Sequence, residues 1–185
     1  MADIRIEKYN VDRFGKELET GKSIFCEDCV KIINSHEREK GDFEEKVMEF
    51  LSDSYEHFTA NKHGCAYILY VNNAPTSMCM FANTNFDNDT LCTEMIYTHK
   101  DKIGCGYARR LFDYALADLA QNKELNSVTS TIELNNEKSL DLHAHFTNEN
   151  VKVSRDDTRI QYEFPLKAFR KDSVNNLEEV EEKTM

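Results

Sequence analysis

The sequence predicts a single domain of the α/β (α+β) class, with a central mixed β-sheet of about six to seven strands flanked by helices. Segments with an extended pattern alternate along the chain with segments of helical periodicity. Several predicted strands are almost continuously apolar, which is typical of strands covered on both faces. With 185 residues, of which 40% are hydrophobic, the chain can bury one core of moderate size. We therefore expect one domain over residues 1–170.

The N-terminal part predicts a strand, helices and a β-hairpin. Residues 4–9 alternate apolar and polar like a half-buried strand, and a weaker helical pattern over residues 11–34 predicts two helices. Asp42 as an N-cap and Glu45 at the capping-box position predict a further helix that ends near residue 61. The hairpin is predicted as strands at 65–71 and 76–82 joined by a turn at 72–75.

The C-terminal part predicts strand, helix, strand, short helix and a closing pair of strands. After a polar loop, a strand at 91–98 leads through a glycine-containing turn into an amphipathic helix. The apolar stripe of this helix consists of Ala108, Leu111, Phe112, Ala115, Leu116 and Leu119. Asn122 is predicted to cap its C-terminus, and Asn136 to begin a short helix that runs to residue 145. Further strands are predicted at 127–134, 150–153 and 158–164, and a disordered acidic tail at 171–185.

Charge and cysteine content narrow the class of partner. The 23 basic and 34 acidic residues give a net charge of −11, which disfavours nucleic acid and anionic membranes and favours cationic partners. No secretory signal precedes the six cysteines, so we expect reduced thiols and a cytoplasmic location. Cys26 and Cys29 have the spacing of half a zinc site, with His36 downstream, but no second such pair completes it. We expect no metal, and cysteines that pack as small hydrophobic residues.

The stretch over residues 91–112 predicts an anion site. Gly104 and Gly106 allow backbone conformations that other residues avoid, so that successive peptide N–H groups can converge on one anion. The helix that follows presents the positive end of its dipole at the same place. A phosphate group is the expected ligand of this turn.

The same stretch resembles the acyl-CoA-binding motif of the GNAT superfamily of N-acyltransferases. In that motif a strand and a short loop precede Gln or Arg, two variable residues, Gly, a variable residue, and Gly or Ala at a helix start. Gly106 and Ala108 match the two small positions, whereas Ile103 stands where the family has Gln or Arg. Lys100 and Lys102 could partly replace the missing contact.

A second family feature follows at the matching distance. In the family, an Asn after the next strand precedes a short helix that carries a small residue, an apolar residue and often a Tyr. Asn136, Ser139, Leu142 and His143 hold these positions, so His143 replaces the Tyr. With the order of elements, the resemblance covers residues 4–167 or so.

The resemblance implies transfer of an acyl group, most often acetyl, from acetyl-CoA to a primary amine by direct transfer in a ternary complex. An amide near Tyr97 or Thr98 would hold the thioester carbonyl, and turn amides would hold the pyrophosphate. Arg109 would add charge at a phosphate, or stay a solvated helix residue. The full set of implied cofactor-binding residues is Ile96, Tyr97, Thr98, Ile103, Gly104, Cys105, Gly106, Tyr107, Ala108, Arg109, Asn136 and Ser139.

Two side chains are candidates for proton transfer. Glu94 shares strand parity with Cys92 and Ile96, and a carboxylate among apolar neighbours would accept the proton of the amine, directly or through water. Its alternative is an outward-facing or lysine-paired glutamate. His143 is the candidate acid for the leaving thiolate, although the ordinary histidine pKa of about 6.5 makes it a fractional donor at neutral pH. Its alternative is a structural histidine.

The acceptor and the activity itself are left open by the sequence. A small-molecule or peptide amine, cationic in keeping with the net charge, is the expected acceptor, and a homodimer is not excluded. The departures at Ile103 and His143 keep an alternative in view, a catalytically weak or silent acyl-CoA-binding module with a regulatory or interaction role.

Overall fold

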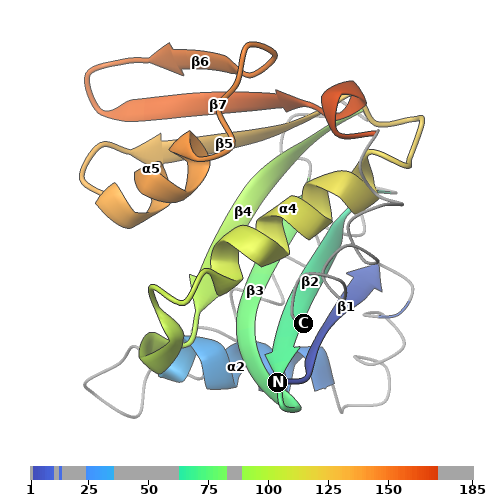
Figure 1. Ribbon diagram of the computed structural model, residues 1–185. Helices are drawn as coiled ribbons and strands as arrows, with labels where there is room; N and C mark the ends of the chain where they lie inside the picture. Colours follow the sequence, from blue (N-terminus) through green and yellow to red (C-terminus); the bar gives the residue numbers. More distant parts are fainter. Residues whose placement is uncertain (1, 11–12, 14–23, 36–62, 83–88, 171–185) are drawn as a thin grey trace, which may run out of the picture.

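The computed structural model describes residues 2–10, 13, 24–35, 63–82 and 89–170 of the chain. These residues contain a seven-stranded sheet with helices on both faces (Figure 1). In sheet order, the strands are β1 (Ile4–Asn10), β2 (Cys65–Val71), β3 (Ala74–Ala82), β4 (Thr90–Thr98), β5 (Ser127–Glu133), β7 (Arg159–Pro165) and β6 (Lys152–Arg155). β4 and β5 are parallel, and every other neighbouring pair is antiparallel. The predicted mixed α/β fold is confirmed.

The described helices agree with the predicted positions. They are α2 (Ile24–Asn34), α4 (Tyr107–Leu119) and α5 (Glu137–Ala144), with short 3-10 turns η1 (Lys100–Lys102) and η2 (Leu166–Phe169). α2 is the second of the two helices predicted over residues 11–34. The predicted helix at 42–61, most of the loop after β3 and the predicted tail at 171–185 lie outside the described residues.

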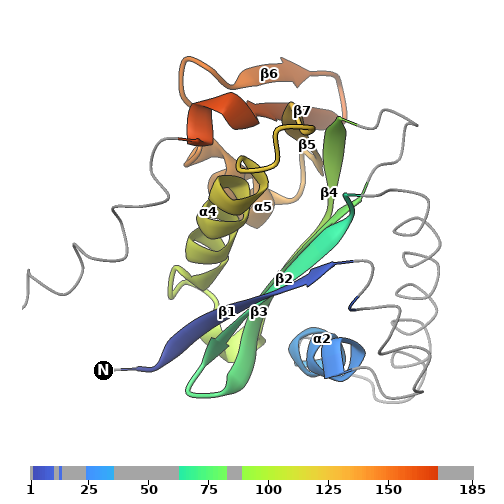
Figure 2. The same cartoon turned by 90° about the vertical axis from the view of Figure 1, so that its right-hand side faces the viewer.

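The sheet separates two clusters of buried side chains. α4 packs on one face and α2 on the other, as the turned view shows (Figure 2). Every residue of β2 is buried, because alternate side chains enter the two clusters: Tyr67 and Leu69 on the α4 side, Ile68 and Tyr70 on the α2 side. This arrangement explains the almost continuous apolar pattern of the strand.

A two-residue turn joins β2 to β3. Asn72 and Asn73 have φ values of 50° and 64°, the left-handed conformation that a type I′ hairpin turn requires at both central positions. Asparagine tolerates this conformation better than most residues. The turn is therefore shorter than the predicted 72–75, and Pro75 already belongs to β3.

α4 begins after Gly106 and ends at Leu119. The predicted stripe is confirmed, since Leu111, Phe112, Ala115, Leu116 and Leu119 are all buried. The predicted C-cap at Asn122 is wrong, because the cap position is Ala120. The Asn122 side chain instead accepts a hydrogen bond from the Glu124 amide, 3.0 Å away, in the turn that follows.

The closing strands are shifted by one or two residues from the predicted bounds. The β6–β7 turn covers residues 156–158, where the Asp156 side chain accepts hydrogen bonds from the amides of Thr158 and Arg159 at 2.7 Å each. An aspartate that binds the backbone two and three residues ahead stabilises such a turn. No helix in the described ranges has the length and apolar character needed to cross a bilayer.

Candidate active site

The central feature of the sheet is the place where β4 and β5 part. The two parallel strands pair over three residues only, Thr90–Cys92 of β4 with Ser127–Thr129 of β5. β5 continues to pair with β7 as far as Glu133. Beyond Cys92 the strands diverge (Figure 1). The second half of β4 therefore has a strand partner on one edge alone within the described part of the chain.

Two polar pairs mark the parting point, one on each face. Cys92 Sγ lies 3.1 Å from Thr129 Oγ1, and Ser130 Oγ donates a hydrogen bond to Thr93 Oγ1 at 2.7 Å. Ser130 shares its face with Val128, which belongs to the α4-side cluster, so the Thr93–Ser130 pair lies on that side. Sequence reasoning gave no site role to Thr93, Thr129 or Ser130, since hydroxyl side chains in strands carry no distinctive pattern.

A β-bulge in β4 follows immediately. Met80 pairs with Met95 and Phe81 with Thr93, so Glu94 is the extra residue of the bulge. Met95 consequently packs on the α2 side, and Ile96 on the α4 side. The prediction that Cys92, Glu94 and Ile96 share one face of the strand is wrong, because the bulge places Cys92 and Ile96 on opposite faces.

The Glu94 side chain is exposed. Its predicted burial among apolar neighbours is therefore wrong, and the outward-facing alternative describes its surroundings better. The bulge nevertheless places this carboxylate within two residues of Cys92, where the strands part. Bulges often aim one side chain away from the regular alternation next to an active site, so the base role stays a prediction that rests on position.

The turn between β4 and α4 has the predicted glycine conformation. Gly104 and Gly106 both have φ of 80°, and a Cβ atom at either position would meet nothing within 4 Å. The requirement for glycine is thus conformational rather than steric. The amides of Gly106, Tyr107 and Ala108 donate to no acceptor among the described residues. They are the free first-turn donors that bind anions at helix N-termini.

Cys105 differs from its neighbours in this turn. Its amide donates to the Lys102 carbonyl at 3.3 Å, so it is not free as the phosphate donor that the resemblance implied. The Arg109 amide, in contrast, is free among the described residues, and the Arg109 side chain is exposed. The free amides therefore begin one residue later than predicted, at Gly106, and extend to Arg109 in the first turn of the helix.

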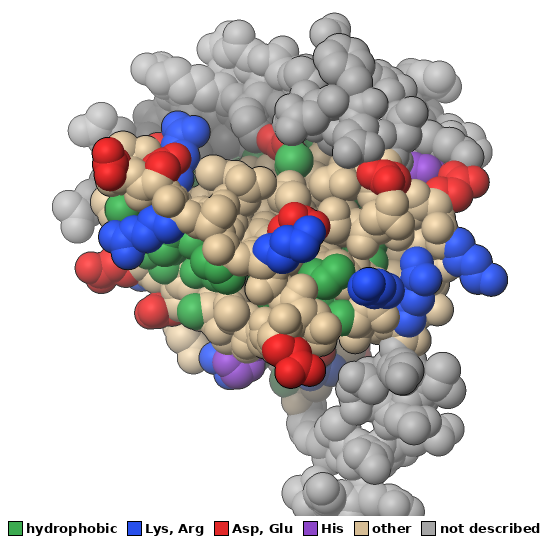
Figure 3. All heavy atoms as spheres, turned by 90° about the horizontal axis from the view of Figure 1, so that it is seen from above, with side chains coloured by type: hydrophobic (Ala, Val, Ile, Leu, Met, Phe, Trp, Pro, Cys, Tyr) green, Lys and Arg blue, Asp and Glu red, His purple; other side chains and the backbone are tan. Residues whose placement is uncertain are grey.

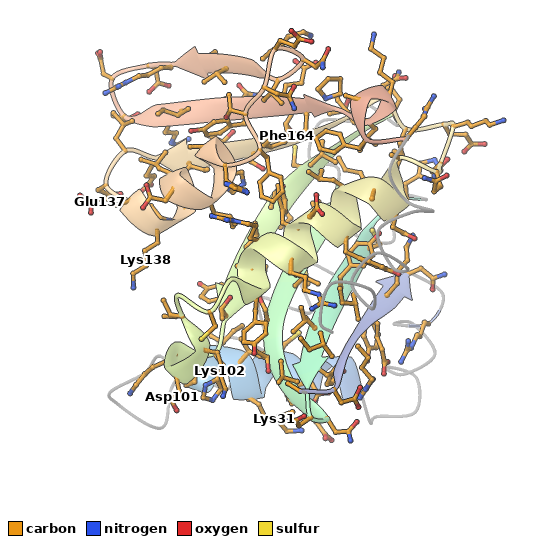
Figure 4. The ribbon with its side chains drawn as sticks, viewed as in Figure 1. Lys31, Asp101, Lys102, Glu137, Lys138 and Phe164 are labelled. Carbon is orange, nitrogen blue, oxygen red and sulfur yellow. The ribbon has the colours of Figure 1, made fainter. Side chains whose placement is uncertain are left out.

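The departure at Ile103 leaves an apolar side chain at the turn, 42% exposed. Lys102 of η1 lies beside it, and Lys138 extends from the first turn of α5 toward the same end of the molecule (Figure 4). Sequence reasoning missed Lys138. A signal was available, because a lysine in the first turn of a helix is unfavourable beside the positive end of the helix dipole. Its presence there indicates a role other than helix stability.

α5 begins with the predicted cap. Asn136 Oδ1 accepts a hydrogen bond from the Ser139 amide at 3.3 Å. Asn136 is exposed and Ser139 half-buried, so both remain accessible at the end of the helix that faces away from the core. The positions agree with the implied cofactor role but do not test it.

His143 lies in the core, 2% exposed. Its ring centroid is 5.1 Å from that of Phe112 and 5.6 Å from that of Tyr162. Nδ1 donates to the Ser139 carbonyl at 2.8 Å, which requires the proton on Nδ1, and Nε2 has no partner among the described residues. Burial lowers the pKa of the imidazole, so it is neutral at pH 7. The surroundings favour the structural alternative over an imidazolium donor.

Two features together define the class of protein. The central parallel strands of a mixed sheet part, and a glycine turn with free amides lies next to them at the start of a helix. The family model of the acetyltransferase (GNAT) family matches residues 30–147. The chain therefore belongs to the GNAT family of acetyltransferases, and the family resemblance seen in the sequence is confirmed.

Solved structures of low sequence identity share the fold. The ribosomal-protein-S18-alanine N-acetyltransferase of Escherichia coli has a TM-score of 0.59 and 11% identity, covering 89% of this chain and 94% of that one. An acetyltransferase of the GNAT family from Streptococcus pneumoniae has a TM-score of 0.56 and 12% identity, covering 88% and 99%. A Salmonella typhimurium protein solved with its cofactor acetyl-CoA has a TM-score of 0.53 and 15% identity, covering 88% and 94%. No curated protein matches the sequence significantly.

Proposed function

We propose that the protein is an N-acetyltransferase that moves an acetyl group from acetyl-CoA to a primary amine by direct transfer in a ternary complex. The observation that carries the proposal is the set of free amides at the start of α4, next to the parted strands. Free amides on a positive-φ glycine turn suit a pyrophosphate. The cofactor recorded for the Salmonella typhimurium structure agrees with this choice of donor.

The pyrophosphate would be held at the turn by the amides of Gly106, Tyr107 and Ala108, with the amide and side chain of Arg109 close by. Lys102 and Lys138 supply positive charge that Ile103 does not. Backbone donors and the helix dipole together favour a multiply charged anion, and exposed lysines add to the attraction at low ionic strength.

The acyl end would lie along the free edge of β4. The His99 amide donates to the Thr76 carbonyl at 2.7 Å, toward β3. Because N–H directions alternate along an antiparallel strand, the amides of Ile96 and Thr98 point to the opposite edge, where β5 has diverged. The Ile96 amide is the donor that we propose for the thioester region, and the amide of Thr98, one of the two predicted positions, has the same direction. An extended ligand can pair with such an edge as an added strand does.

The proton transfers follow from the positions of the side chains. Glu94, beside the parting point, accepts the proton of the attacking ammonium, directly or through water, so that the free amine attacks the thioester carbonyl. The carbonyl oxygen gains charge and is stabilised by a backbone amide of β4. The thiolate that leaves takes its proton from solvent, because the Nδ1 proton of His143 is already donated to Ser139. His143 then acts as a positioning residue of α5.

Coenzyme A release, followed with a thiol reagent, tests the proposal against a broad panel of primary amines. We expect at least one amine to release coenzyme A from acetyl-CoA in a protein-dependent manner and to gain the mass of one acetyl group. Release that appears only with water as acceptor, or none with any amine, contradicts the proposal.

A binding module is the second candidate, and Ile103 and the neutral His143 favour it. Isothermal titration with acetyl-CoA and with coenzyme A separates the two, because a module binds without release. Tight binding in the absence of turnover across the panel would support the module, and absence of binding would exclude both functions.

A further inference from the structure

A polar depression lies on the face of β5, β7 and β6 that faces away from α4. Its volume is about 170 Å³ and its lining consists of Thr131, Ser154, Arg155, Asp156, Arg159 and Gln161. Thr131, Gln161 and Ser154 form one row across the three strands by register. Arg159 stands two residues before Gln161 on β7 and so shares its face. Arg155 pairs with Ile160, which packs on the α4 side, so Arg155 borders the depression at the edge of β6, and Asp156 closes its end at the hairpin turn.

The depression is rich in unused hydrogen-bond donors. Within the described ranges, the side chains of Thr131, Ser154, Gln161 and both arginines make no hydrogen bond. Neither guanidinium forms an ion pair with a described carboxylate. On the face of the depression, Thr131, Ser154, Gln161 and Arg159 offer hydroxyl, amide and guanidinium donors to whatever occupies it.

The one carboxylate in the lining is already engaged. Asp156 Oδ1 accepts from the amides of Thr158 and Arg159 and from the Thr158 hydroxyl, at 2.7, 2.7 and 3.0 Å. These hydrogen bonds lower the pKa of Asp156, which stays ionised and holds the turn. Glu133 pairs with Arg159 across β5 and β7, so a second carboxylate borders this face of the sheet. The depression keeps an excess of hydrogen-bond donors, and Arg159 is the cation on its face.

The size of the depression limits its ligand. Pockets that enclose a whole small molecule are roughly 300–1,000 Å³, so this volume suits one functional group instead. Paired N–H donors of a guanidinium match the oxygens of a carboxylate or phosphate. Described acidic and basic side chains are interspersed on the surface seen over β6 and β7 (Figure 3), so local charge there need not follow the net charge of −11.

The depression lies close to the parting point of β4 and β5. Thr131 is two residues from Thr129 on β5, a separation of roughly 7 Å along a strand. Thr129 contacts Cys92, the last residue of β4 that pairs with β5, on the same face of the sheet. A molecule on this face could thus place an amine at the parting point and another group in the depression.

We propose that this depression binds the carboxylate or phosphate group of the acceptor, which is therefore a primary amine that also carries an anionic group. The inference rests on the proposed acetyltransferase function and adds the class of acceptor. The acidic chain attracts the ammonium group of such a molecule, and Arg159 recognises its anionic end.

Matched pairs of acceptors test the inference: phosphoethanolamine against ethanolamine, and β-alanine against propylamine. We expect KM to be about tenfold lower for the anionic member of at least one pair, as a hydrogen-bonded charge contact can supply. Arg159→Gln should remove this difference and leave the KM for acetyl-CoA unchanged, and Arg159→Lys should restore part of it. Lys167→Gln, an exposed change of equal charge at the other end of β7, is the control.

Titration with inorganic phosphate, followed by NMR, tests the site without turnover. Shifts of the Thr131 and Gln161 amides in the wild type that disappear in Arg155→Gln/Arg159→Gln support the site, and absence of shifts overturns it. Coenzyme A release with neutral and anionic amines alike, unaffected by Arg159→Gln, overturns the acceptor class and leaves the acetyltransferase function intact. If no amine is acetylated, the proposed function fails, and the acceptor assignment fails with it even where phosphate binds. If phosphate binds without competing with the acceptor, the site serves a free anion and the acceptor assignment is wrong.

Discussion

The two halves of the sheet, on either side of the point where β4 and β5 part, differ in how they are covered. From β1 to β4, side chains on both faces pack into the two clusters, and β2 and most of β3 are fully buried. In β5 and β7, alternate residues such as Val128 and Phe164 are buried on the α4 side, while Thr131 and Gln161 on the other side are exposed, and all of β6 is exposed. The first half is built as a core, and the second half keeps one face for solvent or ligands.

Phe112 of α4 joins the two halves. Its ring stacks on Phe81 of β3 at 6.0 Å and meets Phe164 of β7 edge-on at 5.7 Å. We expect Phe112→Ala to lower the free energy of unfolding by about 3–5 kcal/mol, the largest effect among the changes considered. Urea unfolding measures the loss, and hydrogen exchange shows whether the second half opens first.

The comparison would fail if Phe112→Ala changed exchange equally in β2 and β7, since the halves would then behave as one cooperative unit. Tyr114→Ala, at an exposed position of the same helix, is the control, with an expected change within about 0.5 kcal/mol, plus the small part due to its contact with Tyr67.

Glu94→Gln tests the junction between the halves. If the bulge carboxylate is the base, kcat should fall by about 100-fold or more, as loss of a general base usually does. Stability should change little, because the side chain is exposed. Steady-state coenzyme A release measures the effect, with Glu149→Gln, an exposed glutamate in the loop before β6, as the matched control. Full turnover in Glu94→Gln would show that another group accepts the proton.

Gly106→Val tests the anion-binding turn apart from both halves. A β-branched residue at φ of 80° is strained by about 1–3 kcal/mol, so the turn should relax and the free amides lose their alignment. We expect acetyl-CoA to bind about 5–150-fold more weakly by isothermal titration, while the melting temperature changes little. Gln121→Val, an exposed change just after α4, serves as control. Unchanged affinity would place the cofactor elsewhere.

His143→Phe gives the smallest expected effect, a change in the pH dependence of stability. Burial lowers the native pKa of His143 below the ordinary histidine value of about 6.5, so the unfolded state binds more protons in that range. The wild type should therefore lose stability as the pH falls below about 6.5, with a slope of at most about 1.4 kcal/mol per pH unit. Urea midpoints compared over pH 5–8 should show a shallower slope for His143→Phe.

Turnover of the same variant separates the two roles of His143. A structural histidine predicts that kcat in His143→Phe stays within a few-fold of the wild type. A fall of about 100-fold at unchanged stability would instead restore the proton-donor role.

The parts of the molecule that follow local rules were predictable from the sequence. The glycine turn and the buried stripe of α4 were confirmed, because φ preference and helical period are properties of a few neighbouring residues. The bulge at Glu94 was not predictable in this way. It arises from the register of β3 against β4, and one added residue in a strand leaves no mark in composition.

The burial of His143 illustrates the same limit for the candidate site. The residues that enclose it, Phe112, Tyr162 and Phe164, come from α4 and β7, and none is close to it in sequence. The family motif gave its position on α5 but not its neighbours, so the sequence could not set its protonation state. The same holds for the polar depression, which only the register of three strands brings together.

The half of β4 that separates from β5 bears on how far the sequence can change and on whether the protein aggregates. Exposed strand edges at the rim of a sheet invite pairing with other chains, but this edge lies inside the sheet, between flanking strands. A slender ligand with amide groups can reach it more easily than another polypeptide strand can. In the proposed mode of binding, backbone groups make the contact, so side chains there are free to change over evolution, in keeping with a fold shared at 11–15% identity.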